Sequence, residues 1–394
     1  MTAITLSALG ICCALGNNKQ QVWQAAVNGS RHGMVWRNDL LSDATPVVVG
    51  EVSGNLPSLA AFPAEFHSRN NQLALQALQQ MMPQIEQARQ RYGQERIAVI
   101  IGTSTSGIAE GETALAQYRN SGDFPPSYHY HQQEMQAPAR FIARASDVTG
   151  PCYAISTACS SSARALMSAR SLLLAGIADA VIVGGVDSLC RLTVNGFHAL
   201  ESVAAGFCQP FGLNRDGINI GEGAALFLME KNTAGIRLMG AAASSDASHM
   251  SAPHPEGRGA EQAIISACQQ AGISPQQLSY INLHGTATPL NDLMESKVLA
   301  RIGAAQIPAS STKALTGHTL GAAGAIEAAL CWLMLSDYNG NSNIIPHCCD
   351  NPPDPALAPV QLATAGMQAP LRYCLSNSFA FGGNNVAVLL GKEI

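Results

Sequence analysis

Short apolar runs alternate with stretches of helical period along most of the chain. The runs predict strands at 4–9, 96–102, 152–156, 180–185 and 224–230, and then at 236–242, 279–285, 307–312, 373–378 and 386–391. Runs this short and this apolar are typical of strands that are buried on both faces. Because helical patterns separate many of these strands, the sequence predicts an α/β protein with layered helices and sheets.

The two parts of the chain resemble each other in the order of their elements. The run "VIIGTSTSG" (99–107) is similar to "INLHGTATP" (281–289), since each is a strand followed by Gly-Thr-x-Thr. Each part then has a strand that ends in Ser-Thr before a helix rich in small residues, at 155–169 and 310–329. We expect each part to close on an apolar strand, 180–185 in the first and 386–391 in the second. Internal similarity of this kind indicates a duplicated unit.

The repeat predicts two halves, residues 1–235 and 236–394. Two α/β halves related by a pseudo-twofold axis would bring their corresponding turns together at one site. Residues 107–150 have no counterpart of that length in the second half, and we interpret them as an insertion that lines a pocket or a subunit contact. The proline-rich stretch "DNPPDPALAP" (350–359) is expected to be a surface loop.

Charge and composition exclude several classes of protein. Asp, Glu, Lys and Arg make up only 12% of the residues against 47% hydrophobic residues, which indicates a tightly packed protein with much of its surface buried in an oligomer. The net charge of −5 argues against a nucleic-acid binder. The segment "RQRYGQER" (89–96) is interpreted as the solvated end of a helix. No apolar run approaches the length of a membrane span.

The eleven cysteines show no metal-ligand spacing and no C-x-x-C motif. This usage fits a reducing cytoplasm, and we expect a cytoplasmic protein without a metal site. The N-terminal stretch 1–16 is apolar enough to suggest a signal peptide, but it lacks a basic beginning and fits a first strand and turn equally well.

One thiol lies in the middle of a run of small hydroxyl residues, "STACSSS" (156–162). The run before it predicts a strand and the segment after it predicts a helix, so Cys159 lies at a strand-to-helix turn. A thiol near a helix N-terminus has its pKa lowered by the helix dipole, which makes it a candidate nucleophile. The alternative is a small buried hydrophobic residue, as most free cysteines are.

Two histidines and a lysine occupy the corresponding turns of the second half. His284 ends an apolar strand in "HGTATPLND", where a histidine can also have a purely structural role. Lys313 and His318 lie in "STKALTGHTLGAAGA", at the start of a helix packed with glycine and alanine. Burying polar groups in such a core is costly, so their presence there indicates that they have a function.

Five motifs occur in an order that resembles the β-ketoacyl-acyl carrier protein synthases, the condensing enzymes of the thiolase fold: "TACSSS", "RDGINIGEG", "HGTATPLND", "KALTGHTLGAAG" and "NSFAFGGNN". The resemblance spans essentially the whole chain. It implies an α/β, thiolase-like fold with a duplicated five-layered αβαβα arrangement. The Cys-His-His set resembles the elongating type, because the initiating type has an asparagine in place of the second histidine.

The resemblance also implies the chemistry of the site. Cys159 would take an acyl chain as a thioester, and His284 and His318 would stabilise the enolate that malonyl-carrier thioester forms when it loses carbon dioxide. Backbone N–H groups of Cys159 and Phe381 would form the oxyanion hole for the condensation step. Lys313 would be an orienting group paired with Glu295.

Further residues are implied to contact the substrates. Thr286 and Thr288 would bind the pantetheine arm, and Phe379 and Phe381 would form a gate for the acyl chain, with plain core packing as the alternative for both phenylalanines. No cofactor is implied beyond the 4'-phosphopantetheine of the acyl carrier protein. The implied partners are that carrier protein and a second subunit, in a homodimer or in a heterodimer with a chain-length-factor-like relative.

The sequence departs from the family at three positions. The family usually has an arginine and an aspartate where this chain has Gln209 and Gly212, and a glycine where it has Ala380. The missing arginine commonly helps to dock the acidic carrier protein, so other basic residues such as Arg69 or a partner subunit are expected to replace it. Ala380 is expected to stiffen the gate loop.

Three other functions are alternatives to a condensing enzyme of a specialised pathway. A non-catalytic chain-length-factor-like subunit would not need a thiol at the turn, and a degradative thiolase would have a second cysteine near its C-terminus, where "FAFGGNN" has none. Within the family, the short chain and weakened docking motif resemble condensing enzymes of the aryl polyene pathway. Ordinary fatty acid elongation is the alternative, and residues 107–114 together with 125–140 of the facing subunit are expected to decide between them.

Overall fold

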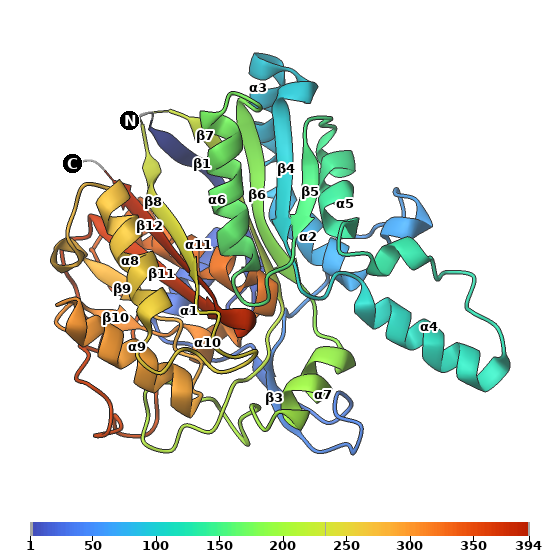
Figure 1. Cartoon of the computed structure of the whole chain (residues 1–394). Coiled ribbons are helices and arrows are strands. Elements are labelled where there is room, and N and C mark those ends of the chain that lie inside the picture. The colour runs from blue at the N-terminus through green and yellow to red at the C-terminus, as the bar shows by residue number, and fades with distance from the viewer. Residues whose placement is uncertain (1–2, 233, 393–394) are drawn as a thin grey trace.

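The computed structural model describes residues 3–232 and 234–392 (Figure 1). Its strands are β1 Ile4–Cys13, β2 Met34–Arg37, β3 Val47–Gly50, β4 Ile97–Gly102, β5 Cys152–Ile155, β6 Ala180–Asp187, β7 Gly223–Lys231, β8 Ile236–Ser245, β9 Tyr280–Asn282, β10 Ala309–Ser310, β11 Tyr373–Ala380 and β12 Asn384–Lys392. Its α-helices are α1 Lys19–Val27, α2 Arg69–Gln79, α3 Met82–Tyr92, α4 Ile108–Ser121, α5 Ala137–Ser146, α6 Ser161–Leu174, α7 Arg191–Ala199, α8 Arg258–Gln270, α9 Pro289–Arg301, α10 Lys313–Thr316 and α11 Ala323–Leu335. Short 3-10 helices are η1 Ala64–Phe66, η2 Gln94–Arg96, η3 Tyr130–Gln133, η4 Pro275–Gln277, η5 Leu320–Ala322 and η6 Phe381–Gly383.

Ten strands join in the order β10-β9-β11-β12-β8-β1-β7-β6-β4-β5. Counted from the junction between β8 and β1, each half places its first strand innermost, followed by its fifth, fourth, second and third strands. At this junction β1 pairs with β8 through one residue pair, Thr5 with Arg237. The duplication that the sequence predicts is therefore present as the same strand order on both sides of one junction.

One detail of the predicted repeat is wrong. The run 386–391 lies in β12, the fifth strand of its half, and its counterpart in the first half is β7. The run 180–185 lies in β6, whose counterpart is β11. The sequence repeat paired two strands that are not equivalent, because both runs are short and apolar. In the structure β7, the strand equivalent to β12, runs antiparallel between β6 and β1.

The helices form three layers around the two half-sheets, which gives the expected five-layered arrangement. Helices α6 and α11 lie between the half-sheets and supply the largest buried cluster together with the inner faces of the strands. Helices α2, α3 and α5 cover the outer face of the first half, and α8 and α9 cover that of the second. Since α6 and α11 follow the turns at Cys159 and His318, the middle layer sets the position of the candidate site.

The structure confirms each of the ten predicted strands, the first of which lies in the N-terminal stretch. It adds the two-stranded sheet of β2 and β3, which the sequence pattern did not indicate. Residues 89–96 end α3 as predicted, with Arg89 and Arg96 paired to Asp147 and Asp179 at 2.6 and 2.7 Å. Residues 350–359 contain neither helix nor strand. Among the described residues, no helix is long and apolar enough to cross a membrane.

The predicted insertion contains α4, η3 and α5. Helix α4 extends away from the body of the molecule (Figure 1), and Tyr118 near its end stacks on Phe124 of the following segment, which in turn stacks on Tyr128. Strand β5, which contacts α5 of the insertion, forms one edge of the sheet. The division of the chain between residues 235 and 236 falls at the start of β8 and stays a prediction.

The close crossing of α6 over β4 generates a prediction for stability. A Cβ at Gly102 would lie 2.3 Å from the backbone nitrogen of Ser162. Overpacking of this kind typically costs about 1–3 kcal/mol, so Gly102→Ala should lower the free energy of unfolding in urea by at least that much. Gly196→Ala is the control, because a Cβ there meets nothing within 4 Å. A Gly102→Ala protein as stable as the control would contradict the packing described.

Candidate active site

The turn between β5 and α6 presents Cys159, and the neighbouring serines close that turn. Ala158 has a φ of 51°, which bends the chain sharply before the thiol. The hydroxyl of Ser161 accepts from the N–H of Thr157 at 2.9 Å and donates to the carbonyl of Ala158 at 2.6 Å. These bonds satisfy backbone groups that the tight turn leaves without helical partners. The serine run therefore fixes the position of the sulfur.

His318 is held by the segment that contains "INIGEG". Its N–H donates to the carbonyl of Asn219 at 2.7 Å, and its carbonyl accepts from Gly221 at 2.9 Å. A Cβ at Gly221 would lie 2.3 Å from the carbonyl oxygen of Thr316, so only glycine permits this approach. The imidazole is thus carried on a rigid backbone contact between distant parts of the chain.

His284 follows β9, and a buried carboxylate holds its backbone. Glu295 on α9 accepts from the N–H groups of His284 and Gly285, both at 2.8 Å. The side-chain amide of Asn377 donates to the same carboxylate at 3.1 Å. Glu295 therefore supports the turn that presents the histidine.

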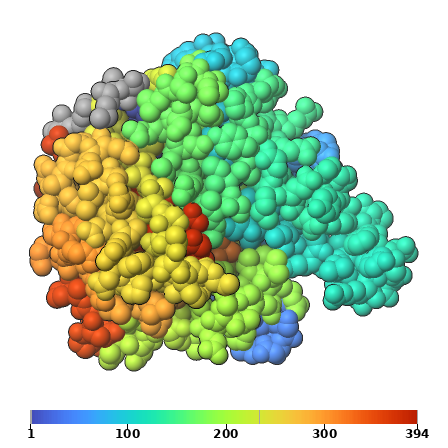
Figure 2. All heavy atoms as spheres, viewed as in Figure 1, coloured from blue at the N-terminus to red at the C-terminus, as the bar shows by residue number. Residues whose placement is uncertain are grey.

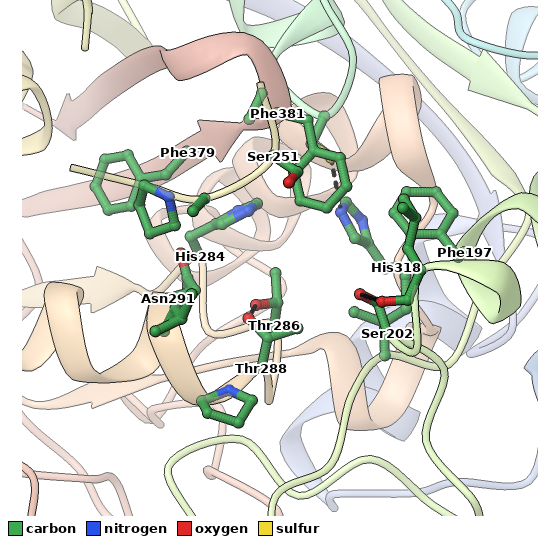
Figure 3. A pocket seen from close by; sticks show the side chains of 18 of the residues that line it. Phe197, Ser202, Ser251, His284, Thr286, Thr288, Asn291, His318, Phe379 and Phe381 are labelled. Atoms are coloured by element: carbon green, nitrogen blue, oxygen red, sulfur yellow. Dashed lines mark hydrogen bonds between the residues drawn. The ribbon is translucent and has the colours of Figure 1, made fainter. Parts of the chain in front are cut away.

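The three side chains line one cavity, in which Figure 3 shows His284 and His318 close to Phe381. The Nε2 atom of His318 lies 3.0 Å from the sulfur of Cys159. The rings of His284 and His318 are 5.6 Å apart between centroids and nearly perpendicular, at 86°. All three residues are buried and line a cavity of about 300 Å³. The convergence that the sequence motifs predict is present.

The predicted pairing of Lys313 with Glu295 is wrong. The Lys313 ammonium pairs instead with Glu327 on α11, and it also donates to the carbonyl of His284 at 2.5 Å. Both members of the pair are almost completely buried. Glu295 is occupied by backbone donors, whereas Glu327 faces the lysine from the middle helix layer. Lys313 does lie beside the site as expected, with Nζ 3.5 Å from Nδ1 of His284.

Burial controls the protonation of the site. It raises the pKa of Cys159 to about 11, an effect that the nearby Lys313 charge and the backbone N–H groups of Phe381 and Cys159 only partly offset. The expected lowering of that pKa by a helix dipole is therefore wrong, because loss of hydration outweighs it. Burial, with Lys313, lowers the pKa values of both His284 and His318 well below the usual range. The thiol and both imidazoles are neutral at pH 7.

The other predicted site residues surround this floor. Phe379, Phe381, Thr286 and Thr288 line the cavity, and the two threonine hydroxyls lie 2.8 Å apart. Phe379 packs 5.8 Å from the His284 ring, while Phe381 lies 5.6 Å from Phe197, a cavity residue that the sequence did not single out. The backbone N–H of Phe381 reaches the sulfur of Cys159.

A buried aspartate also escaped the sequence analysis. Asp187, at the end of β6, accepts from the hydroxyl of Thr103 at 2.7 Å, from the N–H of Ser104 at 2.8 Å and from the N–H of Ala322 at 3.0 Å. It therefore ties the loop after β4 to η5, two residues beyond His318. No motif marks this aspartate, because its donors are spread over distant backbone groups.

A remote carboxylate holds the helix that carries Phe197. Glu112 of α4 accepts from the N–H groups of Arg191 and Leu192, at 2.9 and 2.6 Å. The residue before α7 provides no side-chain cap of its own, so Glu112 takes that role. The insertion is in this way joined to one wall of the cavity.

The predicted replacement for the docking arginine does not offer a free cation. Arg69 forms two hydrogen bonds with Glu222, a completely buried carboxylate, and a third with the carbonyl of Val52. Gln209, which stands where the family has arginine, is itself buried and donates to Asp350 at 3.0 Å. The side chains of Arg69 and Gln209 are therefore both occupied by hydrogen bonds within the chain.

Comparison with known proteins places the chain in one family. Residues 1–234 match the family described as "Beta-ketoacyl synthase, N-terminal domain", and residues 236–344 match "Beta-ketoacyl synthase, C-terminal domain". The chain belongs to the β-ketoacyl synthase family, whose members are acyltransferases. It is 30% identical to "3-oxoacyl-[acyl-carrier-protein] synthase 2" of Staphylococcus aureus (strain COL), over 99% of this chain and 98% of that protein.

Solved structures show the same relationship. The chain is 45% identical to a protein described as "Ketosynthase (ApeO) in Complex with its Chain Length Factor (ApeC) from Xenorhabdus doucetiae", with a TM-score of 0.90 over 100% of this chain and 98% of that chain. It is 25% identical to a β-ketoacyl synthase from Burkholderia phymatum STM815, with a TM-score of 0.87 over the whole of both chains. The thiolase-like fold that the resemblance implied is confirmed.

The raised pKa of Cys159 predicts how the thiol reacts with iodoacetamide. Only the thiolate is nucleophilic, so alkylation of the native protein should speed up about tenfold per pH unit from pH 7 towards the pKa of about 11. Mass spectrometry of the peptide that contains Cys159 measures this rate. In urea, which unfolds the protein, the alkylation rate of the same thiol should level off once the pH passes its ordinary pKa of about 8.5. A native rate that is already constant below about pH 8 would contradict a buried neutral thiol.

The buried Lys313–Glu327 pair predicts a double-mutant cycle. Removal of one partner from such a pair typically costs about 3–5 kcal/mol, because it leaves an uncompensated charge. Lys313→Met should therefore destabilise the protein by about that amount in urea unfolding. Lys313→Met combined with Glu327→Leu should recover most of the loss. A double variant whose loss equals the sum of the losses of Lys313→Met and Glu327→Leu alone would show that the two charges are not coupled.

Proposed function

We propose that this chain catalyses the decarboxylative Claisen condensation of an acyl thioester on Cys159 with malonyl-acyl carrier protein, which gives a β-ketoacyl-acyl carrier protein. The observation that carries the proposal is the contact of 3.0 Å between the Cys159 sulfur and Nε2 of His318, with His284 facing the same cavity. A buried thiol at this position can be acylated, and the two neutral imidazoles beside it can then stabilise an enolate.

In the loading step, Cys159 attacks the thioester carbon of an acyl-carrier substrate. The thiol proton moves to Nε2 of His318 as the carbon–sulfur bond forms, and it leaves with the departing pantetheine thiol. Proton transfer of this kind avoids a free thiolate, which burial disfavours here. The backbone N–H groups of Cys159 and Phe381 are the donors for the tetrahedral oxyanion.

In the condensation step, malonyl thioester loses carbon dioxide and its carbonyl oxygen becomes an enolate. Lys313 lies beside Nδ1 of His284, so the proton of that ring belongs on Nε2, the side that serves the substrate. The Nδ1 of His318 is buried without a hydrogen-bond partner among the described residues, so no bond fixes its tautomer. His318 can therefore accept a proton on Nε2 in loading and, as its other tautomer, donate a hydrogen bond from Nε2 to the enolate.

The supporting residues act through these groups. Glu295 and Asn377 position His284, and the Lys313–Glu327 pair orients its ring. Thr286 and Thr288 are the proposed contacts of the pantetheine arm, and Phe379 and Phe381 form the proposed gate. No cofactor is required beyond the 4'-phosphopantetheine that carries both substrates.

We place the reaction in aryl polyene or polyketide chain elongation in the cytoplasm, with housekeeping fatty acid elongation as the alternative. A 45% identical ketosynthase solved together with its chain length factor supports a dimer of this chain with such a relative. A homodimer is the second possibility. The intact Cys-His-His set argues against a non-catalytic chain-length-factor-like role for this chain.

The two half-reactions are separable by variants of the site. Cys159→Ala should abolish both acyl loading and condensation, since the thiol that accepts the acyl group is lost. His284→Ala should keep loading but lower malonyl decarboxylation by roughly a hundredfold to a thousandfold, the usual cost of one oxyanion donor, because only His318 contacts the sulfur. Radiolabelled acyl transfer and carbon dioxide release measure the two steps. Wild-type rates in either variant would refute the mechanism.

The acyl chain itself distinguishes the pathways. Mass spectrometry of the Cys159 adduct, after co-purification with carrier proteins, reports chain length and unsaturation together. A conjugated polyunsaturated chain is expected for the aryl polyene assignment, whereas saturated chains would favour fatty acid elongation.

A further inference from the structure

The mouth of the cavity is built by three segments that are distant in sequence. They are the end of α7 with residues 200–202, the loop at 251–253 and the start of α9 with residues 288–291. In Figure 2 the red atoms that follow β11 are visible between the yellow and green segments of the surface. The phosphopantetheine arm must enter here to reach Cys159, so any carrier protein must sit on this rim.

Exposed apolar side chains stand on the rim. Leu200 and Leu290 both line the cavity, yet they are 56% and 58% exposed. Met250 is 77% exposed beside Ser251 of the lining, and its carbonyl accepts from the N–H of Gly382 at 2.7 Å. That bond places Met250 next to the loop that carries Phe381. Three large apolar side chains around one opening are a different case from leucines scattered singly over a surface.

The charge on the rim is negative. Glu201, Asp216 and Asp246 line the cavity, whereas none of its described lining residues is lysine or arginine. The nearby Arg215 is engaged by Asp354 at 2.5 Å, and its side chain is only 7% exposed. Arg69 and Gln209 are committed internally, as described above. The described residues that line this mouth therefore offer no basic side chain that would attract a row of carboxylates.

We propose that this mouth receives a carrier protein through apolar contact, with an apolar side chain beside the carrier's prosthetic serine packing between Leu200, Met250 and Leu290. This inference rests on the proposed function. The occupant follows from the chemistry of the rim: carboxylates on the carrier would face Glu201 and Asp216, while an apolar side chain would cover three exposed hydrophobic groups. Burial of apolar surface is far less sensitive to salt than ionic steering.

The test compares one acyl group on two donors. Octanoyl acyl carrier protein covers the rim when its arm enters, whereas octanoyl-pantetheine passes through the same mouth without covering the rim. Leu290→Ser and Leu200→Ser should each raise KM for the carrier-borne donor about tenfold with kcat unchanged, since loss of one anchor in an interface commonly costs about that factor. Loading from octanoyl-pantetheine should fall much less, because this small donor passes through the mouth without packing on the exposed faces of the two leucines. Ile177→Ser is the matched control, because Ile177 is 49% exposed but lies outside the cavity lining.

A salt series provides the second readout. Between about 50 and 500 mM KCl, KM for the carrier should change by less than about twofold, since screened charges contribute little to this contact. The assay is run at one fixed pH, so that only the salt concentration varies.

The outcomes separate this inference from the proposed function. A KM that rises steeply with salt, or leucine variants that match Ile177→Ser, would overturn apolar docking while octanoyl-pantetheine still acylates Cys159. Failure of wild-type protein to accept octanoyl from either donor would instead refute the proposed function.

Discussion

Loss of hydration at the cavity floor is the constraint on which the site depends. It holds Cys159, His284 and His318 neutral, and it makes the buried cation Lys313 dependent on Glu327. In such a dry site, charge that develops on a substrate oxygen interacts strongly with fixed N–H donors and needs no reorganisation of water. A neutral resting site is therefore suited to a reaction whose intermediates are anions.

The duplicated fold explains how these groups come to one place. Each half delivers the turns of the candidate site from the same positions: the turn after the third strand carries Cys159 in one half and leads to His318 in the other, and the turn after the second strand carries His284. Asp187 crosses between the halves by binding backbone donors on both sides. Glycine pairs such as Gly221 and Gly317 allow the backbones to approach. The geometry is thus a property of the repeat and of a few buried polar contacts.

The sequence predicted the strands and the convergence of Cys159 with two histidines, because buried strands and motif residues leave local signals. It did not predict which carboxylate pairs with Lys313, since Glu295 and Glu327 both lie on buried helices and only packing decides between them. It gave the wrong direction for the Cys159 pKa, because a helix terminus is visible in a sequence and the depth of burial is not. Glu112 and Asp187 were missed because both bind backbone groups of distant segments, which no spacing records.

The central claim is that two pairs of donors serve two different oxygens: the imidazoles serve the malonyl enolate, and the N–H groups of Cys159 and Phe381 serve the acyl thioester. A crystal structure of the protein acylated at Cys159, with an unreactive malonyl thioester analogue bound, tests this most directly. The account predicts the acyl carbonyl oxygen about 3 Å from both backbone nitrogens, and the analogue's thioester oxygen at a similar distance from both imidazoles. An acyl carbonyl directed at the histidines would contradict it.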